Sequence, residues 1–186
     1  MLDDAIDASD PERWLAALRA AYACSLSDGA AFWRRAQQAI DRGEQPATAL
    51  ARAAIRGLET MGASDPTSFG MSACDALRLY GGAEELERLR ATRDTLPARK
   101  GLRDWRVETG RALSVMAARV AGECTCAAEA AHGAPVYGDM WRVESEEIDR
   151  DQYCVRMRVR CQRCQSRWLV RRDDGYHYPT FAWSKG

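Results

Sequence analysis

Apolar residues in the first two thirds of the chain recur every three or four positions, which is the period of an amphipathic helix. The pattern is clear from Trp14 to Tyr22 and again from Phe32 to Ile40. Glycines at positions 43, 62, 81 and 82 separate such stretches, because glycine readily adopts the left-handed conformation that ends a helix. The pattern predicts helices that start near positions 11, 29, 46, 66, 83 and 104.

Three Ser-Asp dipeptides mark expected helix starts. In each, the Asp is a candidate N-cap, Pro or Gly follows it, and an aromatic residue comes four positions after the Asp, where it can pack inward. These pairs are Asp10 with Trp14, Asp28 with Phe32, and Asp65 with Phe69.

The stretch DALRLYGGAEELERLRATRD, residues 75–94, reads as a helix, a tight turn and a second helix. It resembles a HEAT-type repeat, and this resemblance implies antiparallel helix pairs that stack along residues 1–122. An irregular helical bundle fits the apolar spacing equally well. In either arrangement this part is a scaffold, because its polar residues form no convergent cluster of catalytic type.

After Gly122 the period changes from that of a helix to that of a strand. In the segment from Tyr153 to Arg160, apolar residues alternate with Cys154 and three arginines, and SRWLVRR continues the strand-like pattern after residue 165. The intervening CQRC therefore lies at the tip of a predicted hairpin. We expect an α+β protein with a helical domain at 1–122 and a small antiparallel β module, similar to a zinc ribbon, at 123–186.

The hairpin tip carries Cys161 and Cys164, a spacing that presents two sulfurs to one side of a metal ion. Cys124 and Cys126 follow the last predicted helix of the scaffold and supply the other half of a tetrahedral shell. The sequence therefore predicts one structural Zn²⁺ bound by these four cysteines. A redox dithiol and four unligated thiols are the alternatives, and His132 is an alternative ligand.

Cys154 stays outside the predicted shell, since it alternates with the arginines and is out of register with Cys161. Cys24 and Cys74 fall in helical stretches, where a free cysteine usually behaves as a small buried apolar residue.

Charge is balanced over the whole chain, with 27 Lys and Arg against 27 Asp and Glu, so no overall field indicates nucleic acid or a membrane surface. Locally, residues 151–186 carry eight positive and three negative side chains, whereas residues 123–150 carry seven negative and two positive ones. If WRVESEEIDRD forms the neighbouring strand, its carboxylates face the arginines in a cross-strand ion ladder. We favour this ladder over nucleic-acid binding.

The C-terminal part also contains the residues that we expect to contact a partner. An arginine strand and nearby aromatic rings can contact phosphates and bases, or they can form a protein-binding surface, although the aromatic residues of the tail can equally close the small core. The candidates are Arg156, Arg158, Arg160, Trp168, Tyr176 and Tyr178.

Several functional classes are disfavoured by the sequence. The acidic first residues do not form an export signal and no window reaches the length of a membrane span, so we expect a cytoplasmic protein. Seven cysteines, unevenly distributed, are not a secreted disulfide framework. Two histidines, no nucleophile elbow and no phosphate-binding loop argue against an enzyme.

The last stretch, CQRCQSRWLVRRDDGYHYPTFAWSKG, is similar to the zinc-ribbon segments of small bacterial immunity-type proteins, which bind toxins. The similarity rests on the Cys-x-x-Cys pair, the Trp soon after it and the GYHYP…W ending. It implies a protein that neutralises a toxin by covering the toxin's surface, and a zinc ion that stabilises the fold of this protein without taking part in a reaction. The alternative is a nucleic-acid-associated zinc-ribbon regulator that uses the arginine-rich strand.

Overall fold

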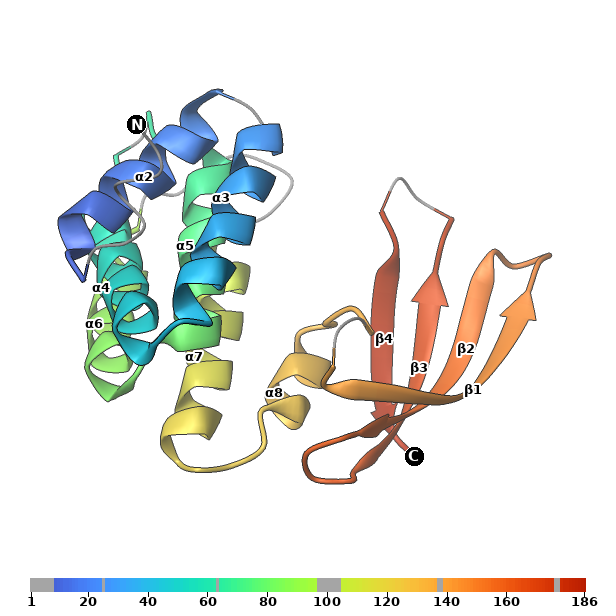
Figure 1. Cartoon of the computed structure of the whole chain (residues 1–186). Coiled ribbons are helices and arrows are strands. Elements are labelled where there is room, and N and C mark those ends of the chain that lie inside the picture. Colours follow the sequence, from blue (N-terminus) through green and yellow to red (C-terminus); the bar gives the residue numbers. More distant parts are fainter. Residues whose placement is uncertain (1–8, 25, 63, 97–104, 137–138, 176–177) are drawn as a thin grey trace. The chain divides into compact units, whose positions relative to one another are not determined.

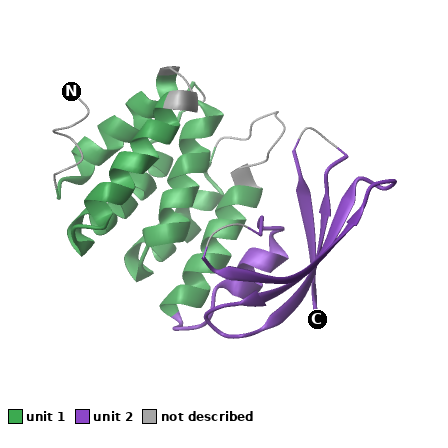
Figure 2. Cartoon of the chain, turned by 45° about the vertical axis from the view of Figure 1, so that its right-hand side comes forward, with its two compact units in different colours: residues 1–120 green, residues 121–186 purple. Residues whose placement is uncertain are grey.

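The computed structural model of the chain describes residues 9–24, 26–62, 64–96, 105–136, 139–175 and 178–186. The chain divides into two compact units, unit 1 (Met1–Val120) and unit 2 (Ala121–Gly186), which are coloured separately in Figure 2. Among the described residues, unit 1 is helical, and unit 2 has one short helix and a four-stranded antiparallel sheet. This order of elements confirms the predicted α+β class.

The helices of unit 1 begin within three residues of the positions predicted from the sequence. They are α2 (Pro11–Cys24), α3 (Leu26–Ile40), α4 (Glu44–Glu59), α5 (Thr67–Tyr80), α6 (Ala83–Arg93) and α7 (Trp105–Val120). Consecutive helices pair as α2 with α3, α4 with α5, and α6 with α7, while α2, α4 and α6 pack in succession, as do α5 and α7 (Figure 1). Unit 1 is therefore built of stacked helix pairs. None of the described helices is long and apolar enough to cross a lipid bilayer.

Only one of the three predicted N-caps is found. Asp10 caps α2, because its Oδ1 accepts the backbone N–H of Glu12 at 2.9 Å. Asp28 instead lies within the first turn of α3, and Asp65 precedes α5 by two residues and accepts the N–H of Gly62 at 2.8 Å. The predicted caps at Asp28 and Asp65 are wrong, because the local Ser-Asp signal does not determine in which turn the helix begins.

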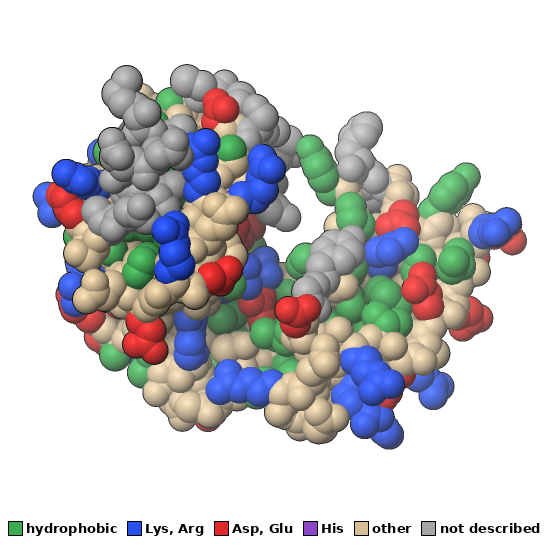
Figure 3. Space-filling model, in the orientation of Figure 1, with side chains coloured by type: hydrophobic (Ala, Val, Ile, Leu, Met, Phe, Trp, Pro, Cys, Tyr) green, Lys and Arg blue, Asp and Glu red, His purple; other side chains and the backbone are tan. Residues whose placement is uncertain are grey.

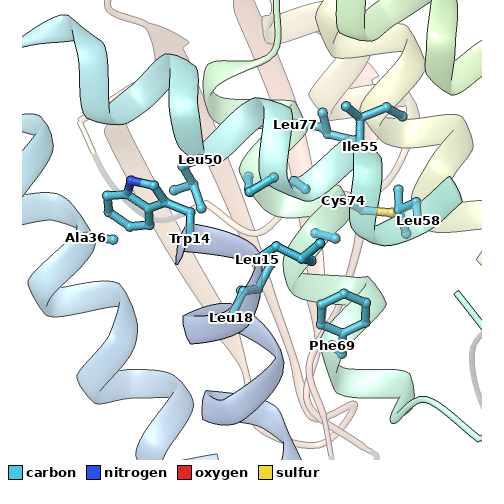
Figure 4. Packing of buried hydrophobic residues seen from close by; sticks show 14 of the residues in the cluster. Trp14, Leu15, Leu18, Ala36, Leu50, Ile55, Leu58, Phe69, Cys74 and Leu77 are labelled. Atoms are coloured by element: carbon cyan, nitrogen blue, oxygen red, sulfur yellow. The ribbon is translucent and has the colours of Figure 1, made fainter. Parts of the chain in front are cut away.

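The aromatic residues that follow those dipeptides are nevertheless buried as predicted. Trp14, Phe32 and Phe69 belong to one apolar cluster to which all six helices contribute. Figure 4 shows Trp14 of α2 between Leu50 of α4 and Ala36 of α3. The rings of Trp14 and Phe32 meet edge to face with centroids 6.1 Å apart. The helical periodicity therefore predicts the core of unit 1 correctly.

Close helix packing in unit 1 depends on the small residues of α4. A Cβ placed on Gly57 would lie 2.7 Å from Cζ of Phe69 and 3.0 Å from Cδ1 of Leu15. Both distances are shorter than normal van der Waals contact, so α4 approaches α2 and α5 at a position where no side chain fits.

The sheet of unit 2 has the strand order β1-β2-β3-β4, so each strand pairs with its sequence neighbour. The strands are β1 (Trp141–Asp149), β2 (Cys154–Cys161), β3 (Arg167–Asp173) and β4 (Thr180–Lys185). Cys161 ends β2 and Cys164 lies in the turn before β3, which confirms that the Cys-x-x-Cys pair is at a hairpin tip.

The register divides the side chains of the sheet between two faces, because residues directly opposite one another point the same way. The apolar face carries Val155, Met157 and Val159 of β2 with Trp168 and Val170 of β3 and Trp183 of β4. The other face, called the arginine face below, carries Arg156, Arg158, Arg160, Arg167, Leu169, Arg171, Ala182 and Ser184.

A bulge in β1 lies between Val143 and Ser145. Before the bulge, Val143 is opposite Val159, and after it Ser145 is opposite Arg158. One extra residue moves the rest of a strand to the opposite face. Both Glu144 and Ser145 therefore lie on the arginine face, as does the later Glu147.

The apolar face of the sheet forms the core of unit 2 with α8 (Cys126–Ala131). Cys126 and Ala130 of α8 belong to the same buried cluster as Val159 and Trp168. In this cluster Trp183 packs against Trp141, and its Nε1 donates to the carbonyl of Ala134 at 2.9 Å. Part of the aromatic C-terminal stretch thus closes the core of this unit.

Candidate metal centre

The first half of the cysteine cluster is held by the start of α8. Cys124 precedes the helix and Cys126 is its first residue, with Thr125 at the N-cap position. The N–H of Glu129 donates to the carbonyl of Thr125 at 3.0 Å, which closes the first turn. The short Cys-x-Cys spacing is possible because the chain changes direction between the two cysteines as it enters the helix.

The second half of the cluster is held by the hairpin between β2 and β3. The N–H of Cys161 donates to the carbonyl of Ser166, and the N–H of Gln165 donates to the carbonyl of Cys161, both at 2.9 Å. Gln165 has a φ of 62°, in the left-handed region, and this lets the chain reverse immediately after Cys164. The turn leaves the sulfurs of Cys161 and Cys164 on the same side.

The four sulfurs lie together although 34 residues separate Cys126 from Cys161 in the sequence. The Sγ atoms of Cys124 and Cys161 are 3.5 Å apart, and those of Cys126 and Cys164 are 3.4 Å apart. All four lie within 4.8 Å of one another. A tetrahedral ion with metal–sulfur bonds of about 2.3 Å holds its sulfurs about 3.8 Å apart, so the cluster has the right size for one ion.

The local environment affects the four thiols unequally. Burial raises the pKa of Cys126 and Cys124 above the usual value for a thiol. The Ser166 hydroxyl, with Oγ 3.2 Å from Sγ of Cys164, lowers the pKa of Cys164 to about 6, and the Ser166 backbone N–H acts in the same direction. Cys164 therefore supplies a thiolate readily, whereas the buried sulfurs need a cation to favour their charged form.

The chemistry of these donors fits a borderline-soft metal ion. Every member of the group is a thiol, and neither His132 nor any described carboxylate belongs to it. Six cysteines of the described part are free thiols, so no disulfide competes for these sulfurs there. Four cysteine sulfurs in a tetrahedron are typical of zinc and of iron–sulfur sites, whereas oxygen ligands suit magnesium and calcium. The four cysteines could hold one metal ion.

Cys154 and Cys74 lie outside this group. Cys154 is opposite Asp149 and Asp173 in the sheet, at the end of β2 away from Cys161. Cys74 is buried in the core of unit 1, where burial raises its pKa. The geometry therefore selects four of the six cysteines whose side chains the structure describes, and the side chain of Cys24 lies outside the described part.

The candidate partner-binding residues are distributed over several environments. Trp168 is only 8% exposed and packs in the core of unit 2, so it has no ring surface to offer a partner. Tyr178 is 80% exposed, and Tyr176 lies outside the described residues. Arg156 and Arg158 are exposed on the arginine face, beside the partly buried Arg160. The prediction for Trp168 was wrong because the register places it opposite Val159, on the apolar face.

The predicted cross-strand ion ladder forms only at one end, where β2 approaches the Cys161–Cys164 hairpin tip. Glu144 pairs with Arg160 and, at 3.9 Å, with Arg167. Arg156 is opposite Glu147 in the register, but neither Arg156 nor Arg158 has an ion pair or side-chain hydrogen bond with a described residue. On the face of the molecule seen in Figure 3, positive and negative side chains are interspersed.

A shallow groove of about 470 Å³ lies on the arginine face, and the sequence alone did not indicate it. All four strands line it, and the lining side chains on this face include Arg156, Arg158, Arg171, Leu169 and Ala182. The groove exists because β4 contributes small side chains where β2 and β3 contribute long ones. Detecting it requires the register, which the sequence does not give.

No protein-family model, curated protein or solved structure that we compared matches this chain. We therefore infer its function from the geometry of the sites described above.

Proposed function

We propose that unit 2 is a zinc-binding module in which Cys124, Cys126, Cys161 and Cys164 bind one structural Zn²⁺, and that the protein acts by binding another protein. The observation that carries the zinc proposal is the convergence of four sulfurs within 4.8 Å. Four protein ligands complete a tetrahedral shell and leave no coordination position for a substrate or a reactive water, which is the arrangement of a structural site.

The small core of unit 2 also supports a structural role for the ion. Cys126 and Cys161 belong to the buried apolar cluster of this unit as well as to the group of four sulfurs. An ion at this position would join the start of α8 to the β2–β3 hairpin and thereby fix the two faces of the core against each other. Small domains commonly need such a metal cross-link, because they bury too little apolar surface to offset the conformational entropy of folding.

Metal analysis of the reduced, freshly purified protein tests this proposal. We expect about one zinc ion per chain, in keeping with one complete tetrahedral shell. Replacing zinc by Co²⁺ should give thiolate-to-metal charge-transfer bands and the strong visible bands of a tetrahedral ion. A protein without stoichiometric metal, or a cobalt spectrum without thiolate bands, would contradict the proposal. Iron in place of zinc would keep the site and change its chemistry.

Alkylation provides a matched control within the same chain. In the metal-loaded protein, Cys164 should resist iodoacetamide although it is exposed, because its sulfur is a ligand. A strong chelator should make Cys164 reactive, whereas Cys74 should stay unmodified because it is buried in unit 1. Reaction of Cys164 at the same rate with and without chelator would show that it binds no metal.

The proposed role in protein binding rests on two features. First, a metal ion bound by four cysteines has no open coordination position for a reaction. Second, Arg156 and Arg158 on the exposed arginine face form no ion pair with a described carboxylate. The similarity of residues 161–186 to immunity-type proteins suggests a toxin as the partner. We expect the tagged protein to copurify with one protein at one-to-one stoichiometry, and coexpression to protect cells from a toxin encoded beside its gene. A toxin that is equally lethal with and without this protein would contradict the immunity role.

Nucleic-acid binding is the second candidate function, and the observation that favours it is that Arg156 and Arg158 are exposed and form no ion pair with a described residue. If it is correct, the protein should bind heparin with an affinity that falls steeply with salt, because phosphate contacts release counterions. Replacing Arg156, Arg158 and Arg160 by Ser should abolish that binding. Retention that does not change in the triple variant would exclude this use of the arginine face.

A further inference from the structure

We propose that the groove on the arginine face binds an acidic, extended segment of a partner protein. This inference rests on the proposed role in protein binding and adds the surface and the chemistry of the segment. The groove has a volume of about 470 Å³, within the usual range for binding sites in proteins. Its lining comes from all four strands, so a segment that lies across it contacts the whole sheet.

The charge of the partner follows from the pairing of the arginines. Arg160 and Arg167 share Glu144, and Arg171 lies 3.7 Å from Asp173, so their charges are partly compensated within the chain. Arg156 and Arg158 line the groove, are exposed, and have no ion pair with a described residue. Their guanidinium groups are therefore available to bind carboxylates in the planar, two-point geometry that arginine favours.

The floor of the groove indicates that the segment also carries an apolar residue. Leu169, at the centre of the sheet between Arg158 and Ser184, is 44% exposed although it is a large apolar side chain. Ala182, opposite Arg171 on β4 and diagonal to Leu169, is also exposed. An apolar side chain of a partner placed here would remove Leu169 from water while neighbouring carboxylates reach the arginines.

The same floor favours a peptide over a nucleic acid. Single-stranded nucleic acids bind by stacking their bases on aromatic rings as well as by phosphate contacts. Among the described residues, no aromatic side chain is on the arginine face, because Trp168 and Trp183 are on the apolar face. The groove side of the arginine face thus offers three arginines against one carboxylate, Glu147, together with an aliphatic surface and no stacking platform.

The probe for this inference is a fluorescein-labelled synthetic peptide in which Glu residues flank one central Leu. Four strands span about 14 Å, so a peptide of about ten residues extends past both edges of the sheet. Two comparison peptides have Gln in place of every Glu, or Ser in place of the Leu, and an oligothymidylate of similar length represents nucleic acid. Binding to the full zinc-loaded chain is followed by fluorescence anisotropy.

We expect the Glu-Leu peptide to bind about tenfold more tightly than the Gln peptide, and the double variant R156S/R158S to lose about tenfold in affinity, as for two exposed ion pairs. The matched control is Arg163→Ser, which removes an exposed arginine of the hairpin tip that does not line the groove. This control should bind the peptide as the unmodified chain does. Zinc content and circular dichroism of each variant verify that the sheet is intact.

Two results with the peptides would overturn the inference: equal affinity for the Glu and Gln peptides, or equal losses of peptide affinity in R156S/R158S and R163S. A third would be that oligothymidylate binds more tightly than the acidic peptide and that its binding depends on Arg156 and Arg158. The proposed function is judged separately on the same samples. A protein partner that still binds R156S/R158S at one-to-one stoichiometry overturns the groove inference and supports the binding role. Absence of zinc from the purified protein would contradict the proposal that unit 2 binds zinc and would leave the proposal about the groove unaffected.

Discussion

The described cluster of unit 1 buries twenty-four residues, all but Met61 from its six helices, whereas that of unit 2 has nine residues, two of which are cysteines of the candidate metal centre. The first cluster is continuous and mainly aliphatic and aromatic. The second depends on a short helix that contributes only Cys126 and Ala130. From this comparison we expect unit 1 to fold by apolar burial without a metal, and unit 2 to depend on an additional link between α8 and the sheet.

The largest expected effect is the loss of a metal ligand. Cys161→Ala should abolish zinc binding and unfold unit 2, since structural zinc contributes on the order of 10 kcal/mol to small modules. Unit 1 should stay folded because its core contains none of these thiols. Hydrogen exchange of peptides from the two units measures both outcomes in one experiment.

The control for this change is Cys154→Ala, which removes another buried cysteine of the same strand from a position outside the cluster. It should keep the full zinc content. If both variants lost zinc equally, or if neither did, the distinction between the two cysteines would be wrong.

The next largest effect should come from the core of unit 1. Phe69→Ala removes a fully buried ring and should destabilise unit 1 by about 3–5 kcal/mol, through lost burial and the resulting cavity. Zinc binding should be unchanged. Urea unfolding followed by far-ultraviolet circular dichroism measures the free energy, and a simultaneous loss of zinc would show that the two units do not fold independently.

A smaller effect is expected where the helices of unit 1 approach most closely. Gly57→Ala places a methyl group 2.7 Å from Cζ of Phe69, and this should destabilise unit 1 by about 1–3 kcal/mol despite the better helix propensity of alanine. Gly43→Ala is the matched control, because a Cβ there meets no atom within 4 Å. The midpoints of urea unfolding of the two variants should therefore differ, and equal midpoints would indicate that α4 and α5 separate without cost.

The smallest effect should come from the ion pairs of the sheet. Glu144→Gln removes the carboxylate that Arg160 and Arg167 share, and we expect a loss of less than about 1 kcal/mol because such pairs are partly exposed. Thermal unfolding of unit 2 at low and high salt measures this contribution. A much larger loss would mean that charge pairing, rather than the metal, dominates the stability of unit 2.

The helices and the four cysteines could be predicted from the sequence for physical reasons. Helical periodicity directly reflects which side of a helix faces the core, so both Trp14 and Phe69 were correctly predicted to be buried. For Phe69 this held although the predicted N-cap at Asp65 was wrong. Cysteine spacing reflects the ligand geometry of the metal. The six-residue α8 was missed because CAAEAA is too short for a periodic signal, and only its position beside the sheet stabilises it.

The surface of the sheet could not be predicted, because it depends on register. A single bulged position decides that Glu147 rather than Glu146 lies opposite Arg156, and the hairpin hydrogen bond from Cys161 to Ser166 belongs to the register that puts Trp168 opposite Val159, on the apolar face. Neither feature has a local sequence signal. The alternation of residues in β2 was correct, but it did not show which strands would supply the neighbours of each arginine.

The bulge in β1 has a further consequence for how the protein behaves at high concentration. β1 is an outer strand of the sheet, and on one side its backbone pairs with no other strand of the part of the chain that the structure describes. The kink after Val143 interrupts the straight row of peptide groups that a strand from another molecule would need as a template, and Glu144, Glu146 and Glu147 add mutual repulsion there. We therefore expect the same irregularity that places Glu147 opposite Arg156 to disfavour edge-to-edge aggregation as well.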